Sequence, residues 1–558
     1  MTAIVPHEGG PGGRPAFGND LHLRLRFGRI LSVLGLELIV VVGAALVACR
    51  LGAQRTGIAS PALLLAAGVL LGFIPAFTGI ELPSAVVLLL FLPALLWWEA
   101  LNTPLREVHK FRRSILLTGT LLVVITAGAV AATAHAFGLP WGPAWVLGAA
   151  LAPTDATAVS VVRRLLPRRE LIVLRAESLI NDGTALVVFG IAVSVVVGEQ
   201  DLSVLTVGWE LFVSYAGGIA AGVIAAVLGV YLRRLTGDIL TAGTVFFLIP
   251  FTGYLLAELI HASGVLAAVA AGLIVSQMGP VYSSAPARRQ FIAFWSLVTF
   301  MLNGALFILI GIEAHPAVRG FDGAALTRAL LMVFAVAAVM TVTRIAFMFV
   351  SAYLIRAIDR RPQQRLLRVS DRSRIVSGLC GFRGAVSLAV ALAVPHTLDS
   401  GAPFPDRDTI VFVAFGVIIV MLLPAFVLPS VVRWARFPAD TRFDDELVLA
   451  RTETTNAAIE ALPRLADETG ADPEAVRRLE AEMREHLEVI DASAGDDRTE
   501  TARLHDDYNR LRLAVIAEKR ATMIRMRNER RIDDTVLHRM QATLDIEEVR
   551  LREDVDED

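Results

Sequence analysis

Two acidic residues, Glu177 and Asp182, lie inside an apolar stretch at about residues 171–197. A stretch of roughly 20 apolar residues is long enough to cross a bilayer as a helix. A charged side chain at the centre of such a helix costs about 2.5 to 3.5 kcal/mol, so both carboxylates need a partner or a bound ion. On a helix Ser178 shares a face with Asp182 and Asn181 shares one with Glu177, whereas the two acids point about 140° apart. We therefore expect the two carboxylates to have different partners.

Two further stretches combine charge with residues that interrupt helices. Residues 152–156 read Ala-Pro-Thr-Asp-Ala, and residues 381–384 read Gly-Phe-Arg-Gly. Proline removes a backbone donor and clashes with the preceding turn, so we expect a broken helix whose freed carbonyls and amides surround Asp155. Such a break can bind an ion. Arg383 could neutralise a helix end or a carboxylate, and we expect Arg344 to have a structural role at another carboxylate or a helix end.

The composition is typical of a polytopic membrane protein that carries a polar domain. Of the 558 residues, 55% are hydrophobic and the formal net charge is −2, a profile that disfavours a soluble α/β enzyme. Cys49 and Cys380 are the two cysteines, and both have apolar surroundings. Neither a disulfide framework nor a cysteine metal site is therefore expected.

Thirteen apolar runs are long enough to span a membrane, which predicts an all-α polytopic fold of about 13 transmembrane helices. The runs lie near residues 30–50, 59–77, 84–101, 115–137, 141–162, 171–197, 207–232, 239–261, 264–278, 291–312, 330–355, 375–395 and 409–432. The fifth run carries Asp155 and the twelfth carries Arg383. Their odd offset of seven helices reverses direction, as inverted-topology repeats with two discontinuous helices require.

Basic residues predict the orientation of the chain, because they are retained in the cytoplasm. Lys and Arg gather in one alternate set of loops, whereas the other set holds only Arg319, Arg328 and Arg407. This places the amino terminus outside and the carboxyl terminus in the cytoplasm, although basic residues just before the first run favour the opposite. The abundance of Arg over Lys indicates a GC-rich bacterium and hence a bacterial plasma membrane.

Composition also divides the chain into three predicted parts. Residues 1–20 are rich in Gly and Pro and are expected to form a disordered tail, and residues 21–437 are expected to form the transmembrane domain. Residues 438–558 are charged, with apolar residues at helical spacing, and are expected to form a helical cytoplasmic domain. We expect that domain to pack on itself or on a second subunit; a calmodulin-like or lipid-binding role for the basic segment 519–531 is the alternative.

In combination, these motifs resemble the monovalent cation/proton antiporter family, in its NhaP-type sodium/proton exchanger branch. The resemblance covers about residues 30–432 and excludes the tail. Its motifs are residues 154–155, 177–182, 302–304 with 311–313, and 381–384.

The resemblance implies roles for particular residues. Asp182 would bind the cation and the proton alternately, and Asp155, Ser178 and oxygens around Thr154 would complete a Na+ site. Glu177 would form a structural salt bridge with Arg383, while Asn181, Arg344 and Asn303 would support the site. Asn181 stands where the electrogenic branch carries a second aspartate, which implies electroneutral exchange of one ion for one. The resemblance also implies a homodimer.

The chemistry of the residues agrees with exchange of Na+ or Li+ for H+, because hard cations prefer oxygen ligands. K+/H+ exchange is the nearest alternative, since residue types do not fix the size of the site. A cation channel, a membrane sensor, or an intramembrane aspartyl protease built on Asp155 and Asp182 is more remote, and the protease lacks a Gly-x-Gly-Asp element. No phosphate-binding loop motif occurs, so ATP is not the expected driver. We expect no resident cofactor and no nucleic acid partner.

Overall fold

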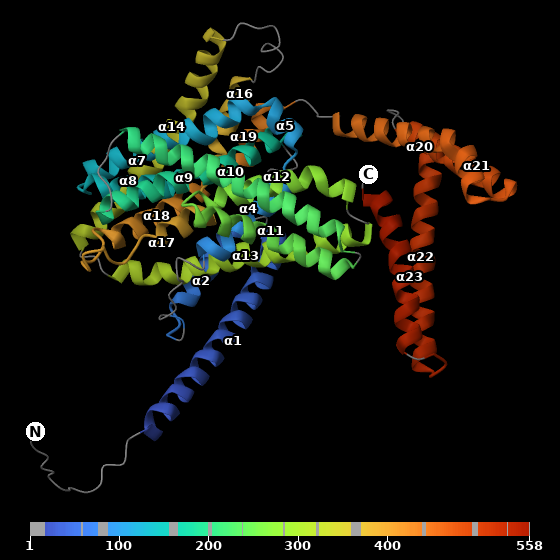
Figure 1. Ribbon diagram of the computed structural model, residues 1–558, viewed down its shortest axis with the longest axis horizontal. Coiled ribbons are helices and arrows are strands. Elements are labelled where there is room, and N and C mark those ends of the chain that lie inside the picture. Colours follow the sequence, from blue (N-terminus) through green and yellow to red (C-terminus); the bar gives the residue numbers. More distant parts are fainter. Residues whose placement is uncertain are drawn as a thin grey trace, which may run out of the picture. The chain divides into compact units, whose positions relative to one another are not determined.

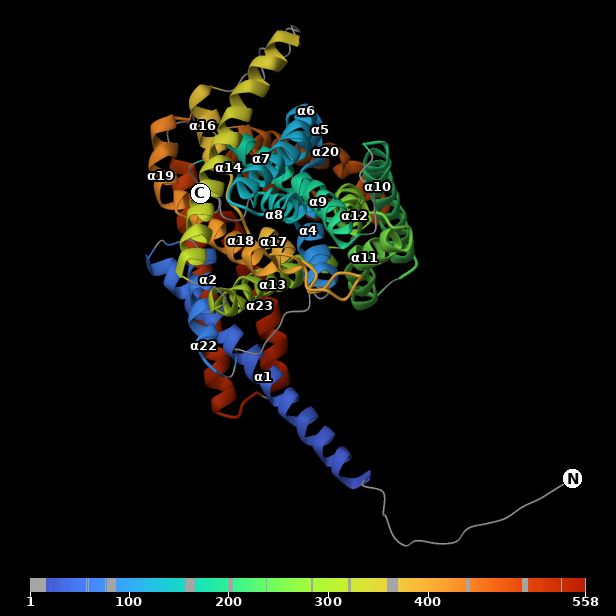
Figure 2. The same ribbon diagram turned by 90° about the vertical axis from the view of Figure 1, so that its left-hand side faces the viewer.

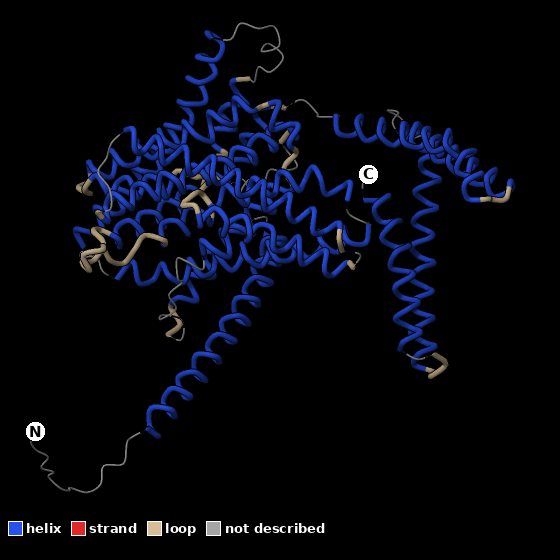
Figure 3. The backbone as a smooth tube through the Cα atoms, in the orientation of Figure 1, coloured by secondary structure: helices blue, strands red, loops and turns tan. Residues whose placement is uncertain are grey.

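The computed structural model is built from helices throughout the part of the chain that it describes, and Figure 3 shows them joined by loops. One isolated bridge, between Thr397 and Pro403, is the exception within that part. The described residues are 17–56, 58, 60–75, 77, 87–155, 166–198, 204–236, 238–282, 285–319, 323–358, 370–437, 442–493, 500–532 and 534–556. The expected all-α fold class is confirmed.

The chain divides into two compact units, Met1–Pro438 and Ala439–Asp558. The first described helices of the first unit, in chain order, are α1 (Phe17–Thr56), α2 (Ser60–Gly72), the π-helical turn η1 (Val87–Phe91), α4 (Leu92–Leu101), α5 (Leu105–Lys110), α6 (Arg112–Leu116), the π-helical turn η2 (Leu117–Leu121), α7 (Leu122–Ala136), α8 (Trp141–Leu151) and α9 (Arg168–Val197). The remaining helices of this unit are α10 (Val204–Arg234), α11 (Ile239–Leu259), α12 (Gly264–Tyr282), α13 (Ala285–Arg319), α14 (Gly323–Ile358), α16 (Asp371–Leu379), α17 (Ala385–Leu392), α18 (Arg407–Leu422) and α19 (Pro424–Ala435).

The number of complete spans differs from the prediction. By length and composition, seven described helices can cross a membrane, or eight if α18 and α19, which are bent by 49° at their junction, form one span. The segments at 60–72, 89–101 and 264–278 are apolar but shorter, and α8, α16 and α17 are halves of interrupted runs. The count of thirteen is therefore not confirmed.

The two terminal parts of the predicted domain organisation can be compared with the described helices. Residues 1–16 of the expected disordered tail lie outside the described part of the chain, and α1 already begins at Phe17. The described helices of the second unit are α20 (Arg442–Thr469), α21 (Pro473–Ser493), α22 (Glu500–Asn528) and α23 (Asp534–Asp556).

The last two helices of the tail, α22 and α23, pack on each other through an apolar seam. Its buried members are Ile516, Met523, Leu537, Leu544 and Leu551. Ion pairs join the same two helices, because Arg512 contacts Glu547 at 2.8 Å and Arg520 contacts both Asp545 and Glu548. Arg520, which belongs to the basic segment 519–531, therefore has acidic partners on α23.

In the first unit, α8, α17 and α18 lie side by side in both Figure 1 and Figure 2, and α9 packs on α8. A continuous core of buried apolar side chains from α4, α8, α13, α14, α17 and α18 surrounds them. The two interrupted runs thus meet inside the bundle.

Glycine permits the tight packing of α2 on α13. A Cβ atom at Gly68 would lie 2.2 Å from the carbonyl oxygen of Ile308, and one at Gly311 would lie 2.6 Å from that of Leu65. Small residues let membrane helices bring their backbones together in this way.

We expect Gly311→Val to destabilise the protein, because the added side chain meets backbone atoms that cannot move without separating α2 from α13. Overpacking of this kind costs about 1–3 kcal/mol. The measurement is the midpoint of thermal unfolding of the purified protein in detergent. Gly243→Val on α11 is the matched control, since a Cβ there has no neighbour within 4 Å; equal midpoints for the two variants would contradict the prediction.

Candidate ion-binding site

Two non-helical segments cross within the bundle. Residues 152–155 follow the end of α8, and residues 380–384 separate α16 from α17. The amide of Asp155 donates a 2.9 Å hydrogen bond to the carbonyl of Phe382, and the hydroxyl of Ser387 donates one of 3.2 Å to the carbonyl of Pro153. Both predicted interruptions are therefore present, although residues 156–165 of the fifth run lie outside the described part.

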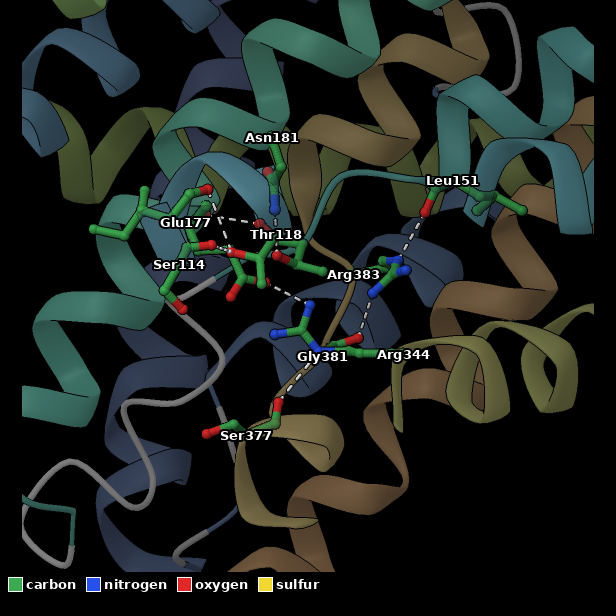
Figure 4. Close-up of polar contacts among 12 residues, drawn as sticks. Ser114, Thr118, Leu151, Glu177, Asn181, Arg344, Ser377, Gly381 and Arg383 are labelled. Atoms are coloured by element: carbon green, nitrogen blue, oxygen red, sulfur yellow. Dashed lines mark hydrogen bonds and ion pairs between the residues drawn. The ribbon is translucent and has the colours of Figure 1, made fainter. Parts of the chain in front are cut away.

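Arg383 binds the last carbonyl of α8 and a carbonyl of the segment that follows α16. Its Nε donates to the carbonyl of Leu151 at 2.7 Å, and its Nη1 donates to the carbonyl of Gly381 at 2.5 Å. Figure 4 shows the guanidinium between these two carbonyls. The last carbonyls of a helix lack intrahelical partners and carry a partial negative charge, so the buried cation compensates the end of α8. It also satisfies a carbonyl of the non-helical segment that follows α16. This is the helix-end role that the sequence left open.

Asp155 lies at the opposite kind of helix end. A Cβ atom at Gly384, the residue that precedes α17, would lie 1.6 Å from Oδ2 of Asp155. Only glycine therefore leaves room for this carboxylate against the first turn of α17. The free amides and the dipole of a helix N-terminus stabilise a negative charge there.

The predicted salt bridge between Glu177 and Arg383 is wrong, because Glu177 pairs with Arg344. Nη1 of Arg344 lies 2.5 Å from Oε1 of Glu177, and both side chains are at most 4% exposed. Nε of Arg344 also donates to the carbonyl of Ser377 at 3.2 Å, in the last turn of α16 (Figure 4). Arg383 is already engaged by backbone carbonyls, while α14 brings Arg344 to the face of α9 that carries Glu177.

Two polar side chains of α9, one on each side of the line between its two acids, contact the residues that follow α8. The hydroxyl of Ser178 donates a 2.7 Å hydrogen bond to the carbonyl of Thr154, and Nδ2 of Asn181 donates one of 2.5 Å to the hydroxyl of Thr154. Asp182, one residue further along, is 3% exposed, and its Oδ1 has no hydrogen-bond partner among the described residues. The two acids of α9 thus have different surroundings, as their angular separation predicts.

Of the predicted site residues, Asn303 is the one that does not join these contacts. Glu99, which was not predicted, lies near the site. Asp182 interacts electrostatically with Asp155 and also with Glu99 of α4. The sequence reveals Glu99 only as one of several acids in apolar runs, so its proximity depends on how α4 packs. Asn303 lies half-buried on α13 and takes no part in the hydrogen bonds described above. Within the described residues, no group of three or more His, Cys, Asp or Glu side chains could hold a metal ion.

Discontinuous helices that meet near buried acids, inside a bundle of membrane helices, define the class of secondary transporters. The sequence matches the family described as sodium/hydrogen exchanger, transmembrane, over residues 40–434. The chain belongs to this family of cation/proton antiporters, which are membrane transporters and not enzymes. The resemblance noted from the motifs is confirmed, and the family excludes the protease alternative.

Curated relatives extend the similarity beyond the membrane domain. An uncharacterized Na+/H+ exchanger of Mycobacterium tuberculosis is 43% identical over 94% of this chain and 97% of its own length. An uncharacterized Na+/H+ exchanger of Escherichia coli is 30% identical over 88% of this chain and 94% of its own. The structure of the sodium proton antiporter MjNhaP1 from Methanocaldococcus jannaschii matches with a TM-score of 0.56 at 17% identity, covering 72% of this chain and 98% of that one, which shows a shared fold.

We expect Arg344→Gln to destabilise the protein by about 3–5 kcal/mol, because it leaves the buried carboxylate of Glu177 without its cation. Adding Glu177→Gln removes that charge and should restore much of the loss, whereas adding Glu177→Gln to Arg383→Gln should not. The measurement is the thermal unfolding midpoint of the four variants in detergent. Recovery in the Arg383 background alone would contradict the observed pairing.

Proposed function

We propose that the protein exchanges Na+ for H+ one for one, by competition of the two ions for the carboxylate of Asp182. The observation that carries the proposal is the environment of this acid, which is buried and retains a carboxylate oxygen without a hydrogen bond from a described residue. A buried carboxylate is costly unless a cation or a proton neutralises it. Because one carboxylate can hold only one of these ions at a time, binding is competitive and transport in opposite directions follows.

The surrounding oxygens supply a binding site for a hard monovalent cation. We place Asp182, Asp155, Ser178 and Thr154 in this site. Because Ser178 gives its hydroxyl hydrogen to the carbonyl of Thr154, the lone pairs of its oxygen are left for a cation. The Asn181 amide holds Thr154 from the other side and fixes the position of that segment.

The neutral side chain of Asn181 supports a stoichiometry of one for one. Its amide cannot carry a transported proton, and it is committed to Thr154. With Asp182 as the exchanging acid, one Na+ moves against one H+ and no net charge crosses the membrane.

K+/H+ exchange is a second candidate, and one relative favours keeping it. An antiporter of Bacillus subtilis that is 31% identical over 66% of this chain carries the name sodium, potassium, lithium and rubidium/H+ antiporter. The same oxygen ligands could accept the larger ion if the site were wider.

We also propose that the transporter lies in a bacterial plasma membrane with its amino terminus outside and its carboxyl terminus in the cytoplasm. The distribution of basic residues between alternate loops supports this orientation. A homodimer without a resident cofactor is proposed from the family resemblance, and the ion gradients supply the energy.

Replacing Asp182 by Asn should abolish exchange, since an amide can neither hold a proton nor neutralise a cation. The assay is Na+-driven dequenching of a pH-sensitive dye in inverted membrane vesicles, repeated with Li+ and K+ to establish the preferred ion. Glu37→Gln is the matched control, because Glu37 is an exposed acid on α1. Dequenching that persists in the Asp182 variant would refute the proposed mechanism.

In proteoliposomes we expect the initial rate of Na+/H+ exchange to be the same at zero and at an imposed membrane potential. The reason is that one-for-one exchange moves no net charge. The potential is set with a potassium gradient and an ionophore, and internal pH is followed by a trapped dye. A rate that changes with the sign of the potential would exclude the stoichiometry while leaving the exchange itself intact.

A further inference from the structure

An acid outside the proposed ion site connects α9 to the broken helix. Glu170 lies in the first turn of α9, seven residues before Glu177, so the two acids lie on nearly the same face about 10 Å apart along the helix. Oε1 of Glu170 accepts a 3.0 Å hydrogen bond from the hydroxyl of Ser373, and Oε2 accepts one of 3.4 Å from that of Ser377. Both serines belong to α16 and are four residues apart, on one face of that helix.

Ser377 is the point where both acids of α9 reach the same residue. Its hydroxyl contacts Glu170, and its carbonyl accepts from Nε of Arg344, whose Nη1 pairs with Glu177. The last turn of α16 is therefore joined to α9 directly, through Glu170, and indirectly, through Arg344 of α14 and Glu177. Beyond that turn lies the 380–384 segment, which carries Arg383 and contacts Asp155.

We propose that Glu170 is a positioning residue for transport. It fixes the position of α16, and thereby of the 380–384 segment, relative to the part of α9 that carries Asp182. It thereby sets the apparent affinity for the transported cation. The inference rests on the cation site proposed above. The hydrogen bonds of Glu170 are made with the two serines of α16, and it acts through them.

Loss of this contact leaves the fold other means of support. Leu174 of α9 and Val376 of α16 belong to one buried apolar cluster, which also includes Cys380, Phe382 and side chains of α19. The ion pair of Arg344 with Glu177 also remains. A variant at Glu170 should therefore fold with α16 in place but less firmly fixed in register.

The test measures the apparent KM for Na+ and the maximal rate of the full-length protein in proteoliposomes. We expect Glu170→Ala to raise the apparent KM between about two- and thirty-fold, the range in which residues outside a site typically alter its energetics, with a smaller change in the maximal rate. The paired substitution Ser373→Ala with Ser377→Ala should give a similar rise. Adding Glu170→Ala to that pair should have little further effect, because the same contact is already lost.

Two further variants separate positioning from other roles. Glu170→Gln keeps an oxygen that accepts from a serine hydroxyl, and it should return the apparent KM most of the way to the wild-type value. Asp371→Ala is the matched control, because this exposed acid on α16 pairs with Arg374 and not with α9; its apparent KM should not change.

An unchanged KM in Glu170→Ala, with only the amount of folded transporter reduced, would overturn the proposal. If that variant does not fold, the serine pair decides in the same way, and a wild-type KM for it would also overturn the proposal. The Asp182→Asn variant is measured in parallel. Exchange that survives there shows a failure of the proposed function, whereas inactive Asp182→Asn with normal Glu170→Ala shows a failure of this inference alone.

Discussion

Interrupted helices inside a membrane leave backbone groups that lipid cannot satisfy, and this constraint governs the centre of the transporter. The structure meets it with opposite charges at opposite helix ends. Arg383 binds the last carbonyl of α8 and the carbonyl of Gly381 in the segment after α16, while Asp155 lies against the first turn of α17. The two segments also bond to each other, through Asp155 and Phe382. Each charge thus stabilises the backbone groups at a helix break, and those groups in turn stabilise the charge inside the protein.

The position of α9 beside this crossing explains why its two acids differ. Glu177 faces α14 and is neutralised by Arg344, so its carboxylate is part of the framework. Asp182 shares its face with Ser178, which donates to the carbonyl of Thr154, and it interacts electrostatically with Asp155. The hydrogen bonds to Thr154 therefore hold the proposed exchanging acid at the crossing.

Much of this arrangement could be predicted from the sequence, because it depends on local chemistry. Pro153 and the glycines around Arg383 indicate where helices break, and the helical period separates the faces of Glu177 and Asp182. The partner of Glu177 could not be predicted in this way, since two arginines lie in apolar runs and the choice depends on how α14 packs against α9. The proximity of Glu99 and the contacts of Glu170 likewise arise between helices that are distant in the sequence.

The corrected ion pair strengthens the argument for exchange at Asp182. A carboxylate that is permanently paired with an arginine is not available to bind and release Na+. Arg344 is held by Glu177 and by the carbonyl of Ser377, and Arg383 is held by two other carbonyls. The described contacts of both arginines are thus made with Glu177 and with backbone carbonyls. If Asp182 is the exchanging acid, as proposed above, Na+ and H+ would neutralise it in turn.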